Sequence, residues 1–176
     1  MDKDIFWGKK RCIDGVNKWL PLRQHLRDTE FVISKLWENC LDEGQRRLIT
    51  DSLKGDDCNP KKLIKFLALT HDIMKIYFVF QTQPNLQYSV DLDYALLERL
   101  ERNGFENIIN LYKNRASYLA EPRATHHAKS GQAFLEDYGV NSDISSIIGA
   151  HHGRPVDSNG LLFLRSMRNS YPRNFF

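Results

Sequence analysis

Apolar residues recur mainly at steps of three and four along the chain, the spacing that places them on one face of an α-helix. After Pro21 this spacing predicts a helix that stops near Gly44 and carries His25 on its inward face. Asn59-Pro60 then resembles an N-cap followed by a proline in the first helical position. The helix that starts there is apolar almost all round over residues 63–73, as expected for a helix buried at the centre of a domain.

The helical periodicity continues through the second half of the chain. Ser142 is expected to cap one of these helices, on which His151 faces the core. Helices are predicted over residues 91–102 (before Gly104), 105–112, 126–139, 142–152 and 161–167, with loops or breaks at 81–85, 121–123, 153–155 and 171–176. No segment shows sustained period-two alternation. We therefore predict an all-α fold and a single domain over residues 1–176.

Composition narrows the class of protein without identifying it. The chain has 176 residues, 41% hydrophobic and 27% charged, which suits one globular domain. A net charge of +3 is too small for a dedicated nucleic-acid arm. Three cysteines without CxxC spacing argue against a disulfide framework and a thiolate zinc site. Without a signal peptide or an apolar run of about 20 residues, a cytoplasmic location is expected.

Aromatic and basic residues mix near the N-terminus, at Trp7, Lys9, Lys10, Arg11 and Trp19. Such a cluster could stack on and neutralise single-stranded nucleic acid. It could also be ordinary packing with a solvated basic face, and this second interpretation is favoured.

The apolar stretch 67–75 delivers a histidine, an aspartate and a lysine to the end of the predicted central helix. A buried imidazole beside a buried carboxylate is costly unless both are paired or bound to metal, so His71-Asp72 calls for an explanation. His71 and Lys75 are four residues apart and are expected to share a helix face. Lys75 is either a snorkelling surface lysine, or it contacts a phosphate or supplies a charge that tunes the site.

The six histidines all fall at predicted helix ends or on inward faces. They are His25, His71, His126, His127, His151 and His152. Any one alone is more often a hydrogen-bonded core residue than a ligand, and the 126–127 pair could lie on the surface at a helix start. Together with Asp72 they exceed what one tetrahedral metal site needs. Two ions sharing a bridging aspartate are a common device for phosphodiester hydrolysis, so the residues favour metal-dependent phosphohydrolysis.

Five motifs in order resemble a known family. They are Trp-Gly-Lys at 7–9, the segments 21–29 and 67–75, His-x-x-x-Gly at 127–131, and Gly-x-His-His-Gly-Arg-Pro at 149–155. This series is similar to the N-terminal HD nuclease domain of CRISPR-associated protein three, the helicase-nuclease of type I interference.

The resemblance implies an HD-domain helical bundle with two divalent metal ions that cleaves single-stranded DNA as an endonuclease or exonuclease. One ion would be held by His25, His71 and a bridging Asp72. The other would be held by His127, His151 and His152. Lys75 would lie near the scissile phosphate, and a one-residue slip would exchange His127 for His126. The ions could be Mn, Ni, Co, Fe or Mg. The implied partners are a type I interference complex and a helicase chain or module.

Two departures from the family pattern leave alternatives open. Met74 stands where the family usually has glycine, and a later metal-binding aspartate is missing, since Asp157 is too close to the 149–155 motif to replace it. The C-terminal part of the domain is therefore expected to be absent. One alternative is an impaired HD-like fragment that binds the interference machinery without cutting. Another is an HD phosphohydrolase acting on nucleotides, against which the 21–29 and 149–155 motifs count.

Overall fold

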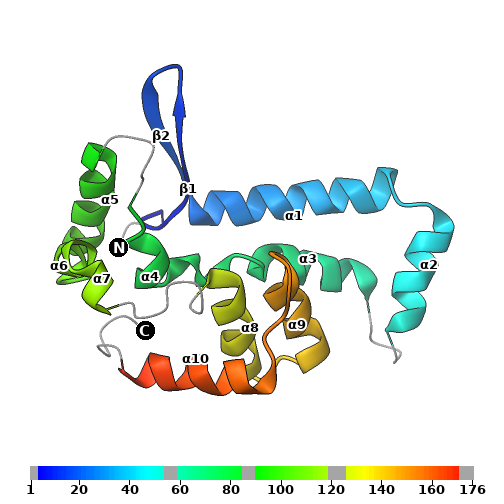
Figure 1. Cartoon of the computed structure of the whole chain (residues 1–176). Helices are drawn as coiled ribbons and strands as arrows, with labels where there is room; N and C mark the ends of the chain where they lie inside the picture. Colours follow the sequence, from blue (N-terminus) through cyan, green and yellow to red (C-terminus); the bar gives the residue numbers. More distant parts are fainter. Residues whose placement is uncertain (1–3, 54–58, 85–89, 119–125, 171–176) are drawn as a thin grey trace.

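The computed structural model describes residues 4–53, 59–84, 90–118 and 126–170 and is mainly helical (Figure 1). The chain begins with an antiparallel hairpin of two strands, β1 (Trp7–Ile13) and β2 (Val16–Pro21). The helices that follow are α1 (Leu22–Asn39), α2 (Glu43–Ser52), α3 (Pro60–Thr70), the 3-10 turn η1 (Ile73–Ile76), α4 (Phe78–Gln81), α5 (Val90–Arg102), α6 (Ile108–Lys113), α7 (Arg115–Tyr118), α8 (His127–Asp137), α9 (Ser142–Ala150) and α10 (Ser158–Ser170). The predicted helical class is confirmed. The breaks expected at 121–123 and 171–176 lie outside the described residues.

The hairpin is the exception that the periodicity did not predict. Its loop is Asp14-Gly15, and both residues have positive φ, 52° and 76°. Asp-Gly is a preferred pair for a two-residue turn of this kind. Both faces of the hairpin carry polar residues, so apolar alternation is absent. The Asp14-Gly15 dipeptide was therefore the one sequence feature in this segment that indicated a hairpin.

An arm formed by α2, the end of α1 and the start of α3 extends away from the rest of the molecule (Figure 1). In it α1 and α3 lie side by side, and α2 joins them at the far end. The expected stop near Gly44 was wrong, because Asp42 and Gln45 form a capping box there. The Asp42 side chain accepts from the Gln45 N–H at 2.8 Å, and the Gln45 side chain accepts from the Asp42 N–H at 3.0 Å. This box starts α2, which the sequence pattern did not reveal.

The start of α3 was predicted well, but its burial was not. The Asn59 side chain accepts from the N–H groups of Lys61 and Lys62 and so caps the helix. Of the α3 side chains only Ala68 is buried, and Leu69 is 37% exposed. The start of α3 lies in the projecting arm, away from the helices of the second half (Figure 1).

The main core forms instead around the segment after α3. Its buried members are Ile5, Met74, Tyr77, Phe78, Val79, Leu97, Leu100, Ile108 and Leu111. Met74 thus packs into the core. Gln81 and Thr82, expected in a loop, are 3% and 1% exposed because α4 turns them inward.

In the second half, the helix boundaries mostly follow the sequence pattern. Gly104, with φ of +98°, follows α5, as a glycine after a helix end should. The α9 cap is Asn141, whose side chain accepts from the Asp143 N–H, and not Ser142. Helices α8 and α9 pack against each other, and α10 packs against α8. None of the described helices combines the length and apolarity that crossing a membrane requires.

Candidate metal centre

Asp72 lies where α3 gives way to η1. The predicted continuation of the helix through Lys75 was wrong, since α3 ends at Thr70 and a 3-10 turn follows. Residues three apart eclipse in such a turn, so Lys75 lies beside Asp72 and not over His71. The Lys75 ammonium is 2.7 Å from Asp72 Oδ2.

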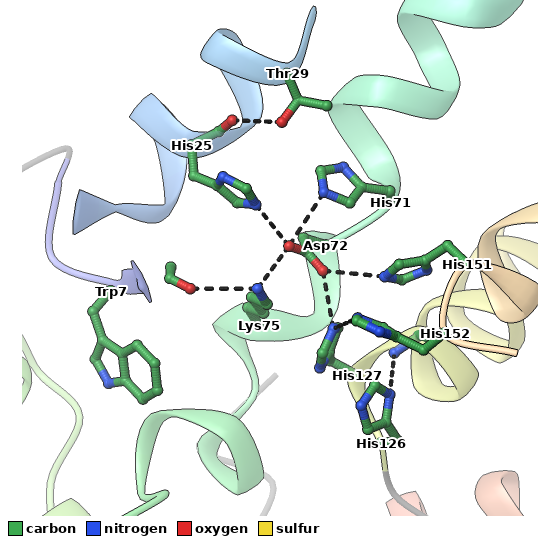
Figure 2. A network of polar contacts seen from close by, with 12 residues as sticks. Trp7, His25, Thr29, His71, Asp72, Lys75, His126, His127, His151 and His152 are labelled. Carbon is green, nitrogen blue, oxygen red and sulfur yellow. Dashed lines mark hydrogen bonds and ion pairs between the residues drawn. The ribbon is translucent and has the colours of Figure 1, made fainter. Parts of the chain in front are cut away.

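Figure 2 shows five basic side chains directed at the two oxygens of Asp72. Oδ2 lies 2.8 Å from His25 Nε2, 3.2 Å from His71 Nε2 and 2.7 Å from Lys75 Nζ; Oδ1 lies 3.0 Å from His127 Nε2 and 3.3 Å from His151 Nε2. His152 Nε2 lies 3.2 Å from His127 Nε2. The structure thus brings together all six residues predicted as ligands.

The donors form two groups that share one carboxylate. The first is His25, His71 and Asp72; the second is Asp72, His127, His151 and His152, with ligand atoms within 4.8 Å of one another in each group. This division matches the one that the resemblance implies. Asp157 belongs to neither group: it is exposed, and its carboxylate accepts from the Gly160 N–H at 2.8 Å.

The orientation of two imidazoles shows that the site suits a cation. His71 Nδ1 lies 2.8 Å from the Ala68 carbonyl, and His151 Nδ1 lies 2.6 Å from the Ile148 carbonyl. A carbonyl only accepts, so each Nδ1 carries a proton, and an unprotonated Nε2 directs its lone pair toward Asp72. Two lone pairs cannot form a hydrogen bond, and buried Asp72 Oδ1 has no hydrogen-bond partner. A bound metal ion would accept these lone pairs and contact the carboxylate, so the donor set fits a cation.

The charges of the site follow from burial and contact. Burial would raise the pKa of the Asp72 carboxyl, but the facing imidazoles of His127 and His151 outweigh it and hold that pKa well below its usual range. Burial lowers the pKa of both His127 and His152. The carboxylate is therefore ionised and these two rings are neutral, the forms in which both groups bind metals. Burial would lower the pKa of His151 as well, but its contacts with Asp72 and the Ile148 carbonyl raise it.

Lys75 is not a snorkelling surface residue. The residue is 8% exposed, and its ammonium donates to the Gly8 carbonyl at 3.3 Å and lies 5.0 Å from the Phe80 ring centre. These contacts fix the ammonium against Asp72 Oδ2. Lys75 is the cation that balances the buried carboxylate.

His126 and His127 have different surroundings although they are adjacent. His127 Nε2 faces Asp72, whereas His126 Nδ1 accepts from the Ala128 N–H at 3.4 Å and caps α8. Burial, then the neighbouring His127 and His152, lower the pKa of His126 from 6.5 to about 4. His126 therefore acts as a helix cap in this structure.

Replacing His126 by Asn should weaken the acid sensitivity of the metal-free chain. Between pH 6.5 and about 4 the unfolded His126 binds a proton that the folded one does not, so stability falls as pH falls through this window. Asn caps a helix without titrating. Thermal unfolding of chelator-treated protein at pH 7 and pH 5 should show a smaller loss of melting temperature for H126N than for the unsubstituted chain. Equal losses would contradict this assignment.

A buried glutamine, Gln81, joins the first strand to the turn that carries Lys75. Gln81 accepts from the Trp7 N–H at 3.3 Å and donates to the carbonyls of Trp7 at 2.9 Å and Lys75 at 2.6 Å. The Trp7 indole donates to the Gln81 carbonyl at 3.2 Å. The next residue, Gly8, receives the Lys75 ammonium, and a side chain there would meet Leu22 Cα at 3.0 Å. Gln81 thus holds the first strand against Lys75.

Replacing Gln81 by Met is expected to destabilise the chain by about 3 kcal/mol or more. The substitution leaves one N–H and two carbonyl groups of the backbone unpaired, and each costs roughly 1–3 kcal/mol when buried. Chemical denaturation measures the loss. Q83M is the matched control because Gln83 is exposed, and it should change stability by less than about 0.5 kcal/mol. Similar losses in both variants would contradict the role given to Gln81.

A mainly helical domain with a His-Asp pair, its aspartate buried and facing histidines from other helices, defines the HD class. Residues 7–171 match the family described as "Cas3, HD domain", and the chain belongs to this family. It is 45% identical over 177 residues to the CRISPR-associated nuclease/helicase Cas3 of Streptococcus thermophilus, covering 98% of this chain and 18% of that protein. The chain therefore spans under a fifth of its relative's length. No solved structure matches it significantly.

Proposed function

We propose that the chain is a metal-dependent nuclease that cleaves single-stranded DNA in type I CRISPR interference. The observation that carries this proposal is the buried Asp72 carboxylate shared by two groups of imidazole donors. Membership of the Cas3 HD family supports a hydrolase acting on nucleic acid. We assign the first ion to His25, His71 and Asp72, and the second to Asp72, His127, His151 and His152.

The bound ions would activate a water molecule and stabilise negative charge on the phosphate. The protein supplies the geometry. The Ala68 and Ile148 carbonyls fix the rings of His71 and His151 with Nε2 toward the centre. Lys75 orients the Asp72 carboxylate and places a positive charge beside the position where the phosphate gains negative charge.

The proposed partners of the chain are inferred from the relative's name, which includes a helicase. A helicase module or a separate helicase chain would deliver the single strand, and the interference complex would select the target. These partners imply that the chain acts in the cytoplasm, where invading DNA is exposed.

One feature favours a second candidate, an HD-like chain that binds the interference machinery without cutting. Among the described residues the first group has only three donors, against four in the second. A first site of this kind would hold its ion weakly and could leave the centre half loaded.

Metal content and substrate preference together test these functions. The purified chain is loaded with manganese, its bound metal is counted by mass spectrometry, and it is assayed on circular single-stranded DNA, duplex DNA and nucleoside phosphates. Two ions per chain and cleavage of the single strand alone are expected. One ion without cleavage would support the non-cutting candidate, and hydrolysis of nucleoside phosphates alone would indicate a nucleotide phosphohydrolase.

A further inference from the structure

The hairpin carries three exposed cations on one face. Lys9 and Arg11 are two residues apart on β1, and Lys18 lies opposite Arg11 on β2. Within the described part of the chain, none of the three forms an ion pair. The hairpin itself projects beyond the helices (Figure 1). Its three-cation face, hereafter the outer face, is therefore open to a ligand.

The other face of the hairpin is occupied. Lys10 lies 2.5 Å from Asp93 of α5 and 4.1 Å above the Trp7 ring, and Trp19 lies 5.2 Å from the Arg99 guanidinium. Trp7 is 5% exposed and cannot stack on a ligand. The N-terminal aromatic and basic cluster thus divides into residues that pack on α5 and residues that point away from it.

Electrostatic repulsion between like charges on the outer face destabilises the hairpin. Arg11 and Lys18 are cross-strand partners, and like charges in that position destabilise a hairpin. An acidic residue at either position would have formed a favourable pair. A bound anion would offset the repulsion, so the pattern suits a polyanion that contacts several cations at once.

We propose that the outer face binds the phosphate backbone of single-stranded DNA and leads the strand to the metal centre, a proposal that rests on the nuclease function above. Lys9 directly follows Gly8, whose carbonyl receives the Lys75 ammonium, so β1 leads toward the site. Arg11 lies roughly 10 Å along the strand from Gly8. At the tip, Ile13 and Val16 are 40% and 56% exposed and can contact unstacked bases, whose faces a duplex hides.

The test is DNA binding by the metal-free chain, which is independent of cleavage. The variant K9Q/R11Q/K18Q is compared with K61Q/K62Q/K113Q, which removes the same charge from exposed lysines of α3 and α6. Fluorescence anisotropy with a labelled oligothymidylate is recorded from 50 to 300 mM salt. Each single-strand phosphate contact contributes about 0.7 to the slope of log affinity against log salt. The hairpin variant should therefore lose about 2 from this slope and bind roughly 10- to 100-fold more weakly at 0.1 M salt.

Each outcome bears on the proposal. Loss in the hairpin variant alone, with an unchanged melting temperature, supports it, even if the chain proves unable to cleave. Equal effects of the two triple variants, or no effect of either, overturn it. Tighter binding of duplex DNA or RNA than of oligothymidylate by the unsubstituted chain also overturns it, since the outer face would then serve another polyanion.

Discussion

Replacing Asp72 by Asn is expected to abolish both metal binding and DNA cleavage. Asp72 is the carboxylate common to both donor groups, so one substitution removes the negative ligand from each. Losing a residue that merely orients a ligand typically costs 10- to 100-fold in metal affinity, so losing the shared ligand should cost more than about 100-fold. Mass spectrometry of bound manganese and cleavage of circular single-stranded DNA measure the two effects.

Two further variants make this result interpretable. D72N leaves buried Lys75 without its carboxylate, which alone can cost about 3–5 kcal/mol. D72N/K75M removes both charges and should recover stability without recovering metal. D157N is the matched control, because Asp157 is exposed and outside both groups, and it should bind metal normally. Normal metal content or cleavage in D72N would refute the proposed centre.

Adding metal to the chelator-treated chain is expected to raise its melting temperature by about 5–10 °C. A ligand present at 100 times its dissociation constant stabilises the folded state by about 2.7 kcal/mol, and each kcal/mol shifts the melting temperature of a chain this size by about 2–4 °C. The cause is that the imidazoles and the ionised Asp72 are gathered in the folded chain and not in the unfolded one, so the ion binds the folded state preferentially.

Scanning calorimetry with manganese against a chelator measures this shift. D72N/K75M should show almost none, and H126N should keep it, because His126 caps α8 and lies outside both donor groups. A shift of the same size in D72N/K75M would mean that the stabilising metal binds elsewhere.

The gathering of the histidines was predictable because each motif lies at a helix end with local signals. Asn59-Pro60 sets the start of α3, and the helix then delivers His71 and Asp72 at its other end. The apolar spacing of α1 predicted which face of the helix is buried, and His25 lies on that face as expected. The division into two metal groups came from the family resemblance, since no spacing in the sequence specifies which distant histidines meet.

The contacts that hold Lys75 in place could not be predicted from the sequence, and the reason is physical. Helix α4 is a single turn, too short for periodicity, so Gln81 looked like the start of a loop. Its partners Trp7 and Lys75 depend on tertiary contacts that no local pattern encodes. The end of α3 was missed likewise, because the apolar run continues past Thr70 while the Asp72 contacts turn the chain.

The ligands that meet at Asp72 come from distant parts of the chain: His25 is 47 residues before it, and His127 and His152 are themselves 25 residues apart. Contacts of such long range close long loops, so their formation costs chain entropy and slows folding. Two bound ions would therefore act as cross-links, one joining α1 to the end of α3 and the other joining the end of α3 to α8 and the end of α9. The rate at which a refolding chain takes up metal would accordingly report when its last helices dock, which makes the ion a kinetic probe of assembly.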